Sequence, residues 1–208
     1  DITVGALSTF DFGNQIANVV SVGVRPKPEQ QFQFAYVGNL QDGRNSNGVM
    51  LNYFDRVGDL EVYSTNQLSD DQNRGSGIRN SMGVSYNKGS QYISLDLSQV
   101  SADFNPWLGF SSERNYYGAS LFYNADATPS SGPVNSFEYG FGGRSYVRHG
   151  GDFYRDGLDI YGSVNLKNGF AIGGSIEWDK FEQFADHSFE IGMGYPYNNP
   201  YNGLGFEY

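Results

Sequence analysis

The sequence predicts an all-β protein, an antiparallel transmembrane β-barrel of about 12 strands with short periplasmic turns and long outer loops. Three observations support it: the composition, long runs in which apolar and polar residues alternate, and connections that are by turns short and long. The 208 residues include 28 Gly, and 16% are aromatic, which favours strands and turns over helices. The chain has no run of about 18 apolar residues, which excludes a transmembrane helix. A barrel strand needs apolar residues only at alternate positions.

The alternation is clearest in residues 158–181, LDIYGSVNLKNGFAIGGSIEWDKF. Side chains of a strand point to opposite faces with a period of two. Leu158 and Ile160 therefore share one face, while Asp159 points to the other, and the alternation resumes after Asn168-Gly169. This segment predicts a hairpin with one apolar and one polar face.

Similar runs occur along the whole chain, and each run predicts one strand. We expect strands near residues 2–9, 16–25, 30–38, 48–54, 59–66, 78–86, 91–99, 114–124, 135–147, 157–167, 170–181 and 200–208. The four runs from 114–124 to 170–181 reach the length of about 9–11 residues that a tilted membrane-crossing strand requires. No Pro/Ser linker divides the chain, so residues 1–208 are interpreted as one barrel domain. Because the chain begins at Asp1 without a signal peptide, either a targeting segment was removed or the chain is part of a longer one.

The connections between these runs differ in length. Short connections lie at residues 26–29, 56–58, 87–89 and 167–169, and longer polar ones at 39–47, 67–77, 100–113, 148–156 and 182–199. Short and long connections largely alternate, except that residues 125–134 form a long turn where a short one is expected. This alternation is typical of outer-membrane barrels, whose periplasmic turns are short and whose outer loops are longer.

The two faces of the runs have different chemistry. One face carries apolar side chains such as Ile93, Leu121 and Ile160. The opposite face carries charged residues, which a barrel turns into its lumen because lipid cannot solvate them. The predicted lumen-lining residues are Arg79, Asp96, Arg114, Glu138, Arg144, Arg148, Asp159, Glu177 and Asp179. Their mixed charges predict either a polar plug or a path that selects small hydrophilic solutes.

A secreted soluble β-sandwich that binds glycans through exposed Tyr and Trp is an alternative interpretation of the same alternation. Such a sandwich would bury Leu95, Leu121 and Ile160 between two sheets, whereas a barrel would turn them to lipid. Aromatic residues near the ends of runs favour the barrel, since Tyr and Trp are enriched at membrane interfaces. These residues are Tyr86, Tyr123, Tyr146, Trp178 and Tyr208.

Composition excludes several partners. The net charge of −10 leaves no basic surface for phosphates, so no nucleic-acid partner is expected. The chain has no Cys, which excludes disulfides and thiolate metal sites. Residues 41–48 and 69–77 offer oxygen ligands but lack the spacing of a Ca²⁺ loop. We therefore expect no metal and no cofactor, and we expect the lipid bilayer, lipopolysaccharide and other envelope proteins as partners.

The titratable residues do not predict an enzyme. His149 and His187 fall in predicted outer loops beside Asp152 and Asp186, and a His–Asp pair can activate water or a serine. The serines considered are Ser111 and Ser112. Nothing in the sequence brings these groups together, so no catalytic residue is predicted, and an outer-membrane hydrolase is kept as an alternative.

Four stretches resemble parts of one protein family. They are TVGALSTF at residues 3–10, SADFNPWLGF at 101–110, ERNYYGASLFYN at 113–124 and LKNGFAIGGSIEWDKFEQF at 166–184. The family comprises large Gram-negative outer-membrane proteins with an upstream domain similar to family-9 carbohydrate-binding modules and a C-terminal β-barrel of uncharacterised function. The resemblance covers most of the chain, and DFNPxLGF is its distinctive part. It implies an outer-membrane barrel continued at both ends, either porin-like or a structural scaffold, and it supplies no catalytic residues.

Overall fold

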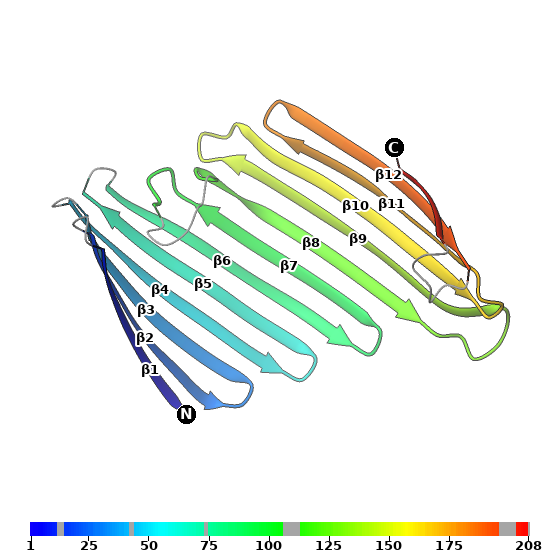
Figure 1. Cartoon of the computed structure of the whole chain (residues 1–208), viewed down its shortest axis with the longest axis horizontal. Coiled ribbons are helices and arrows are strands. Elements are labelled where there is room, and N and C mark those ends of the chain that lie inside the picture. The colour runs from blue at the N-terminus through cyan, green and yellow to red at the C-terminus, as the bar shows by residue number, and fades with distance from the viewer. Residues whose placement is uncertain (12–14, 42–43, 73–74, 106–112, 196–202, 208) are drawn as a thin grey trace. The chain divides into compact units, whose positions relative to one another are not determined.

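Every element in the described part of the chain is a β-strand, which confirms the all-β prediction. The structure, a computed structural model, describes residues 1–11, 15–41, 44–72, 75–105, 113–195 and 203–207. In these residues thirteen strands follow one another in chain order, each hydrogen-bonded to the next (Figure 1). The pairs from β1 to β5 and from β10 to β13 are antiparallel. Across the described ranges, no helix is long and apolar enough to span a membrane.

The strands are longer than those of ordinary globular sheets, which average about five or six residues. Their bounds are β1 (Ile2–Asp11), β2 (Gln15–Lys27), β3 (Gln30–Gln41), β4 (Arg44–Val57), β5 (Leu60–Asp71), β6 (Gly75–Lys88), β7 (Gln91–Val100), β8 (Tyr116–Ala127), β9 (Val134–Arg148), β10 (Phe153–Leu166), β11 (Ala171–Phe181), β12 (Phe184–Gly194) and β13 (Gly203–Glu207). The first twelve strands have 10 to 15 residues each. This reaches the length that a bilayer-crossing strand needs, about 9–11 residues.

The hydrogen-bonded strand order is open in the described residues. It begins at β1 and ends at β13, and no pairing joins these two strands there. Closure of the sheet into a barrel therefore stays a prediction.

The chain divides into two compact units. Unit 1 consists of Asp1–Val84, Asp96–Gly118 and Val147–Asp152, and unit 2 of Ser85–Leu95, Ala119–Tyr146 and Phe153–Tyr208. Unit 1 contains β1 to β5, and unit 2 contains β10 to β13. The strands between them contribute residues to both units.

The hairpin of residues 158–181 forms as the alternation predicts. In the β10–β11 pair, Ile160 lies opposite Ile176 and Asp159 lies opposite Glu177. Directly opposed residues of a pair project to the same face, so the apolar and charged faces continue from strand to strand. Gly169 has a φ of 93° in the turn, a backbone conformation that glycine adopts without steric cost.

In the part of the chain that the structure describes, no second layer covers the apolar face. Leu95, Leu121 and Ile160 remain 42%, 39% and 46% exposed. Similar exposure holds for many apolar residues at alternate strand positions, including Leu51, Phe141, Leu158, Ile172, Ile176, Phe189 and Ile191. A sandwich that buries this face between two sheets is therefore not what this chain forms. We call this surface the apolar face and the opposite one the polar face.

Burial is concentrated on the polar face, which is the reverse of a soluble β-protein. Among the described residues, buried positions on this face include Ala35, Ser46, Ser69 and Ser94. All four are small residues. Tyr154, Phe104 and Val100 are the largest almost fully buried apolar side chains in the described ranges.

Several strands extend into segments that the sequence predicts to be long loops, which corrects the predicted loop lengths. β3 ends at Gln41 and β4 begins at Arg44, β6 begins at Gly75, and β10 begins at Phe153. The predicted loop at 182–199 contains β12, a whole strand that was not predicted. Asp, Asn and Gly residues made these strand ends resemble turns, yet paired strands tolerate them where one face is polar. β7 ends at Val100 and β8 begins at Tyr116, so the long connection predicted at residues 100–113 lies between these two strands.

The aromatic residues predicted at strand ends do not all lie on one face. In β9, Tyr146 shares the face of Arg144 and Arg148 by strand alternation, so its expected place in an outer aromatic belt is wrong. Tyr86 and Trp178 are on the apolar face, both partly exposed. Tyr208 lies outside the described residues.

Candidate functional site

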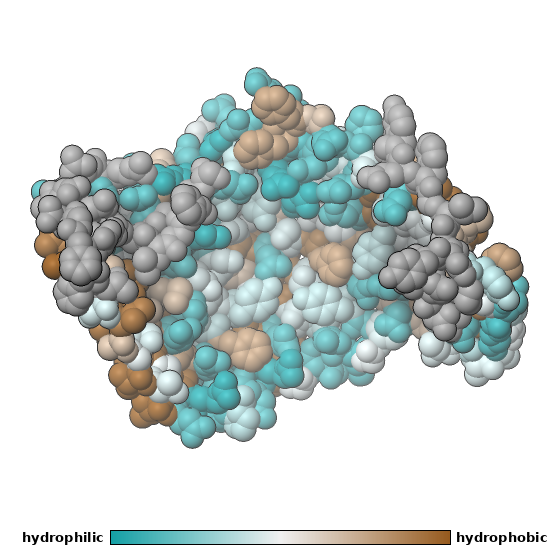
Figure 2. Space-filling view, in the orientation of Figure 1, coloured by the Kyte–Doolittle hydropathy of each residue, from teal (hydrophilic) through white to brown (hydrophobic). Residues whose placement is uncertain are grey.

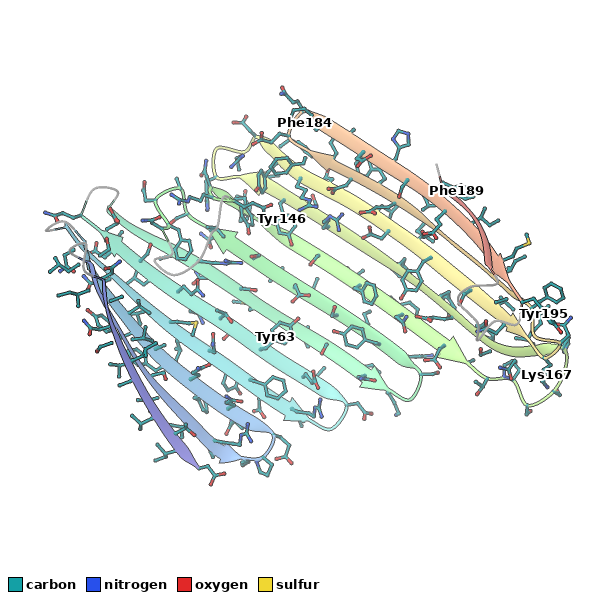
Figure 3. All side chains as sticks on the ribbon, in the orientation of Figure 1. Tyr63, Tyr146, Lys167, Phe184, Phe189 and Tyr195 are labelled. Atoms are coloured by element: carbon teal, nitrogen blue, oxygen red, sulfur yellow. The ribbon has the colours of Figure 1, made fainter. Side chains whose placement is uncertain are left out.

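The polar face is the candidate functional surface because it gathers the charged and hydrogen-bonding side chains of successive strands. In the view of Figure 2, hydrophilic and near-neutral residues dominate over the middle strands. Figure 3 labels Tyr63 of β5 among them. The predicted lumen-lining residues form separate clusters on this face in each unit.

Unit 2 holds a network of three carboxylates and two guanidinium groups. Arg144 of β9 lies 3.2 Å from Asp179, 3.4 Å from Asp159 and 3.7 Å from Glu177. Arg155 of β10 forms a two-pronged contact with Asp179, with N–O distances of 2.8 and 3.1 Å. Four of the five groups are half-buried and Glu177 is more exposed, so water still reaches the network.

Glycines make room for this network. A Cβ added at Gly157 would lie 2.5 Å from Nε of Arg144, and one at Gly142 would lie 3.1 Å from Oδ2 of Asp159. Gly157 is directly opposite Asp179 in the β10–β11 register. The missing side chain lets the Arg144 guanidinium reach across the strand to Asp179. The ion pairs thus depend on small residues as well as on charges.

Glu138 belongs to a second, hydrogen-bonded cluster in unit 2. Asn124 of β8 donates from Nδ2 to Glu138 at 2.8 Å and to the Tyr161 hydroxyl at 2.6 Å. The Tyr161 ring lies over Gly140, where an added Cβ would approach ring atoms to 2.6 Å. The tyrosine therefore lies flat against the sheet in the space that a glycine leaves.

Unit 1 also has a tyrosine that packs over a glycine of the neighbouring strand. The Tyr63 hydroxyl donates to Asp96, and both groups lie over Gly83, where an added Cβ would be 2.5 Å from Asp96. On neighbouring strands Arg56 and Glu61, opposite each other in the β4–β5 register, form an ion pair. Arg79 is half-buried on the same face of β6.

Arg114 and Arg148 take part in a third cluster, where residues 101–105 after β7 lie on the polar face. Arg114 donates to Oδ1 of Asn105 at 3.2 Å, and Arg148 donates to the Arg114 carbonyl at 2.6 Å. Asn105 donates to Asp71 at 3.2 Å from Nδ2 and to the Ser69 hydroxyl at 3.0 Å from its backbone N–H. The two arginines therefore contact the described ends of the connection between β7 and β8.

Sequence reasoning missed two residues that organise these clusters. Arg155 fell in a predicted loop, although it has the same parity as Asp159, and extending the alternation to the start of β10 would have found it. Asn105 fell in the stretch DFNP, and no period or motif indicated that it would turn back onto the sheet.

The structure separates the predicted His–Asp pair at the C-terminal end. His187 is not in a loop but in β12, directly opposite Trp178 on the apolar face. Asp186, the neighbouring residue in the strand, lies opposite Asp179 on the polar face. The two side chains therefore point to opposite faces and do not form a dyad.

In what the structure describes, no hydrogen bond or ion pair joins His149 to Asp152. His149 follows β9 with its ring 5.4 Å from that of Tyr117, and Asp152 is exposed in the same turn. Ser111 and Ser112 lie outside the described residues. Among the described residues no cluster of three or more His, Asp or Glu could hold a metal ion.

Two hollows mark the surfaces of the units. A polar hollow of about 310 Å³ in unit 1 is lined by residues that include Thr3, Ser21, Arg25 and Gln33. A hollow of about 470 Å³ in unit 2 is lined mainly by apolar residues of β9 to β12, including Tyr139, Ile172 and Phe189. Neither lining includes a histidine.

Comparisons with known proteins give little that bears on function. No family model matches the chain, and no curated protein matches it. One similar solved structure is described by the words "Unveiling the Mechanism Behind the in-meso Crystallization of Membrane Proteins". The alignment covers 100% of this chain and 82% of that one, with 9% identity and a TM-score of 0.36. At this level the likeness carries no argument about this chain.

Proposed function

We propose that this chain is a β-barrel of the bacterial outer membrane whose polar face lines a path for small hydrophilic solutes. The observation that carries the proposal is the exposure of apolar side chains at alternate positions along strand after strand, as at Leu95, Leu121 and Ile160. Soluble monomers rarely expose contiguous apolar surface of more than a few hundred Å². Hydrocarbon is the solvent that makes such a face favourable.

The polar face supports the second half of the proposal. Its ion pairs and hydrogen-bonded tyrosines are the groups that water and small polar solutes can solvate. A bilayer does not tolerate unpaired strand edges, because each exposed N–H and C=O in hydrocarbon costs several kcal/mol. We therefore expect the sheet to close in the membrane, with the lipid bilayer and lipopolysaccharide as its surroundings. Membership of the outer-membrane family that the sequence resembles is part of the same proposal.

A scaffold barrel with a filled interior is the second candidate, and the Arg144 network favours it. Arg144 and Arg155 together contact Asp159, Glu177 and Asp179. A network of this kind can fill a narrow interior as a polar plug. Catalysis is not proposed, since the described residues do not converge on a nucleophile and its base.

Reconstitution into a planar lipid bilayer tests the proposal. The full chain is refolded into detergent, added to the bilayer, and single-channel current is recorded in KCl. Stepwise conductance, abolished when the same preparation is heat-denatured, is the expected result. Stable insertion without conductance would support the scaffold. A chain that stays monomeric and folded without detergent would contradict both.

A further inference from the structure

We infer that residues 101–105, hereafter the 101–105 segment, cover part of the polar face of unit 1. The segment thereby limits which solutes reach that part of the face. This inference deepens the proposed function. The part that concerns the size of the solute rests on the proposed function. Loops normally run over the outside of a protein because their backbone polar groups need water. This segment leaves β7 and lies on the polar face, where the N–H groups of Ser101 and Asn105 donate to Ile78 of β6 and Ser69 of β5.

The backbone of the segment is fixed to β6. The Ser101 N–H donates to the Ile78 carbonyl at 2.9 Å, and the Ile78 N–H donates to the Ser101 hydroxyl at 2.9 Å. The Phe104 N–H donates to the Ser101 carbonyl at 3.3 Å and closes the turn. One main-chain bond and one bond to the Ser101 side chain thus attach the start of the segment to β6.

Close packing holds the centre of the segment. Phe104 is 1% exposed, and Val100, the last residue of β7 before the segment, is fully buried. The Phe104 backbone lies against Gly77 of β6, so that a Cβ at Gly77 would collide with Phe104 main-chain atoms. The segment therefore packs directly on Gly77, and a larger residue at this position would displace the segment.

Side-chain hydrogen bonds hold the far end of the segment. Asn105 joins Ser69 and Asp71 of β5 on one side and Arg114 on the other. The Asp71 carboxylate also accepts from the Ser46 hydroxyl at 2.7 Å, and Ser46 and Ser69 are 2% and 3% exposed. The segment is therefore held by several part-buried hydrogen bonds that involve two buried serines.

The position of the attachment gives the segment its role. Ser46, Ser69, Asp71 and Gly77 all lie on the polar face by the register of β4 and β5 and by the alternation of β6. They lie toward the strand ends, where β4 begins, β5 ends and β6 begins. A segment seated there covers the polar face from one end. Under the proposed function it narrows the path at that end and sets the size of the solute that passes.

Thiol labelling tests the cover without relying on conductance. The chain has no Cys, so Gln67→Cys supplies one reporter on the polar face of β5, two residues from Ser69. Gly77→Ala and, separately, Asn105→Ala are introduced to unseat the segment. Gly48→Ala is the matched control, because its Cβ would lie 3.7 Å from the nearest atom, an ordinary contact. Reaction with a charged, bilayer-impermeant thiol reagent is followed in folded protein.

We expect labelling to be roughly tenfold faster in both unseating variants, which corresponds to the loss of one or two hydrogen bonds, and unchanged in Gly48→Ala. Equal rates in all folded proteins would overturn the inference. If Gly77→Ala fails to fold, Asn105→Ala decides the result alone. Planar-bilayer currents of the same proteins separate the two proposals. Faster labelling with no current in any protein would leave the cover standing and overturn the solute path. Faster labelling with larger currents, and entry of larger sugars into vesicles, would support both.

Discussion

At the scale of single residues, the position of a side chain relative to the pleat determines its solvent. Ile176 and Ser175 are neighbours in β11, yet Ile176 is 52% exposed on the apolar face, whereas Ser175 lies on the polar face opposite Tyr161. Because successive side chains point to opposite faces, a shift of one position along the chain moves a side chain from one face to the other. The sensitivity of this protein to a new charge should therefore alternate with a period of two.

Ile176→Arg and Ser175→Arg form a matched pair that tests this alternation. Ile176 is in the middle of β11, opposite Ile160 and Phe189, so an Arg there would cost about 2–4 kcal/mol of folding free energy in a bilayer. Ser175→Arg lies opposite Glu190 and should fold like the parent. Folding into vesicles of defined composition, followed by electrophoretic mobility with and without heating, measures the difference. Similar yields for the two variants would show that the faces are assigned wrongly.

At the scale of the strand, glycine is used on the polar face to seat large side chains. Tyr161 lies over Gly140, Tyr63 over Gly83, and Arg144 against Gly157. Glycine normally weakens a strand because it adds backbone entropy and packs nothing. Here the gap is filled by a side chain from a neighbouring strand, which ties the strands together through contacts beyond the backbone ladder.

Gly140→Ala tests this seating, with Gly143→Ala in the same strand as its control. An added Cβ at Gly140 would be 2.6 Å from the Tyr161 ring, whereas at Gly143 the nearest atom is 3.9 Å away. Displacing Tyr161 also disturbs its hydrogen bond with Asn124. We expect Gly140→Ala to lower the free energy of unfolding by about 1–3 kcal/mol, as overpacking does. Urea unfolding in vesicles, monitored by Trp fluorescence, provides the measurement, and equal midpoints for the two variants would contradict the seating.

At the scale of the whole molecule, the net charge bears on the proposed passage of solutes. The chain carries a net charge of −10. On the polar face of β11 and β12, Glu177, Asp179, Asp186 and Glu190 are acidic by the strand register. Only Asp179 of these is held by two arginines. Fixed charges along a narrow path raise the local concentration of the opposite ion.

If the polar face conducts, it should therefore pass K⁺ more readily than Cl⁻. The reversal potential in a KCl gradient measures the preference. Glu177→Gln combined with Glu190→Gln should reduce it. The matched change His187→Gln, on the apolar face, should leave it unaltered. A path that prefers Cl⁻, or one indifferent to both carboxylate changes, would contradict this expectation. High salt should weaken the preference, because it screens the fixed charges.

The sequence by itself determined the strands and their two faces. A period of two is a local property of an extended chain. It can be recognised in a segment such as residues 158–181 without knowledge of the rest of the molecule. For the same reason it placed Arg144, Asp159, Glu177 and Asp179 on one face. It located strand ends less well, since Asp, Asn and Gly favour turns locally but are accepted on the polar face of a paired strand, as in β12.

Only the tertiary structure decided which of these residues meet. The contact of Arg144 with Asp179 crosses β10 and needs Gly157 between them. The return of Asn105 to Ser69 and Asp71 joins residues that are 36 and 34 positions apart. Such contacts depend on register and on the space left by small residues in other strands, and neither is encoded in a local pattern. The apolar face shows the same division. Its composition follows from the sequence, but only the exposure of Leu95, Leu121 and Ile160 shows that the described residues leave it uncovered there.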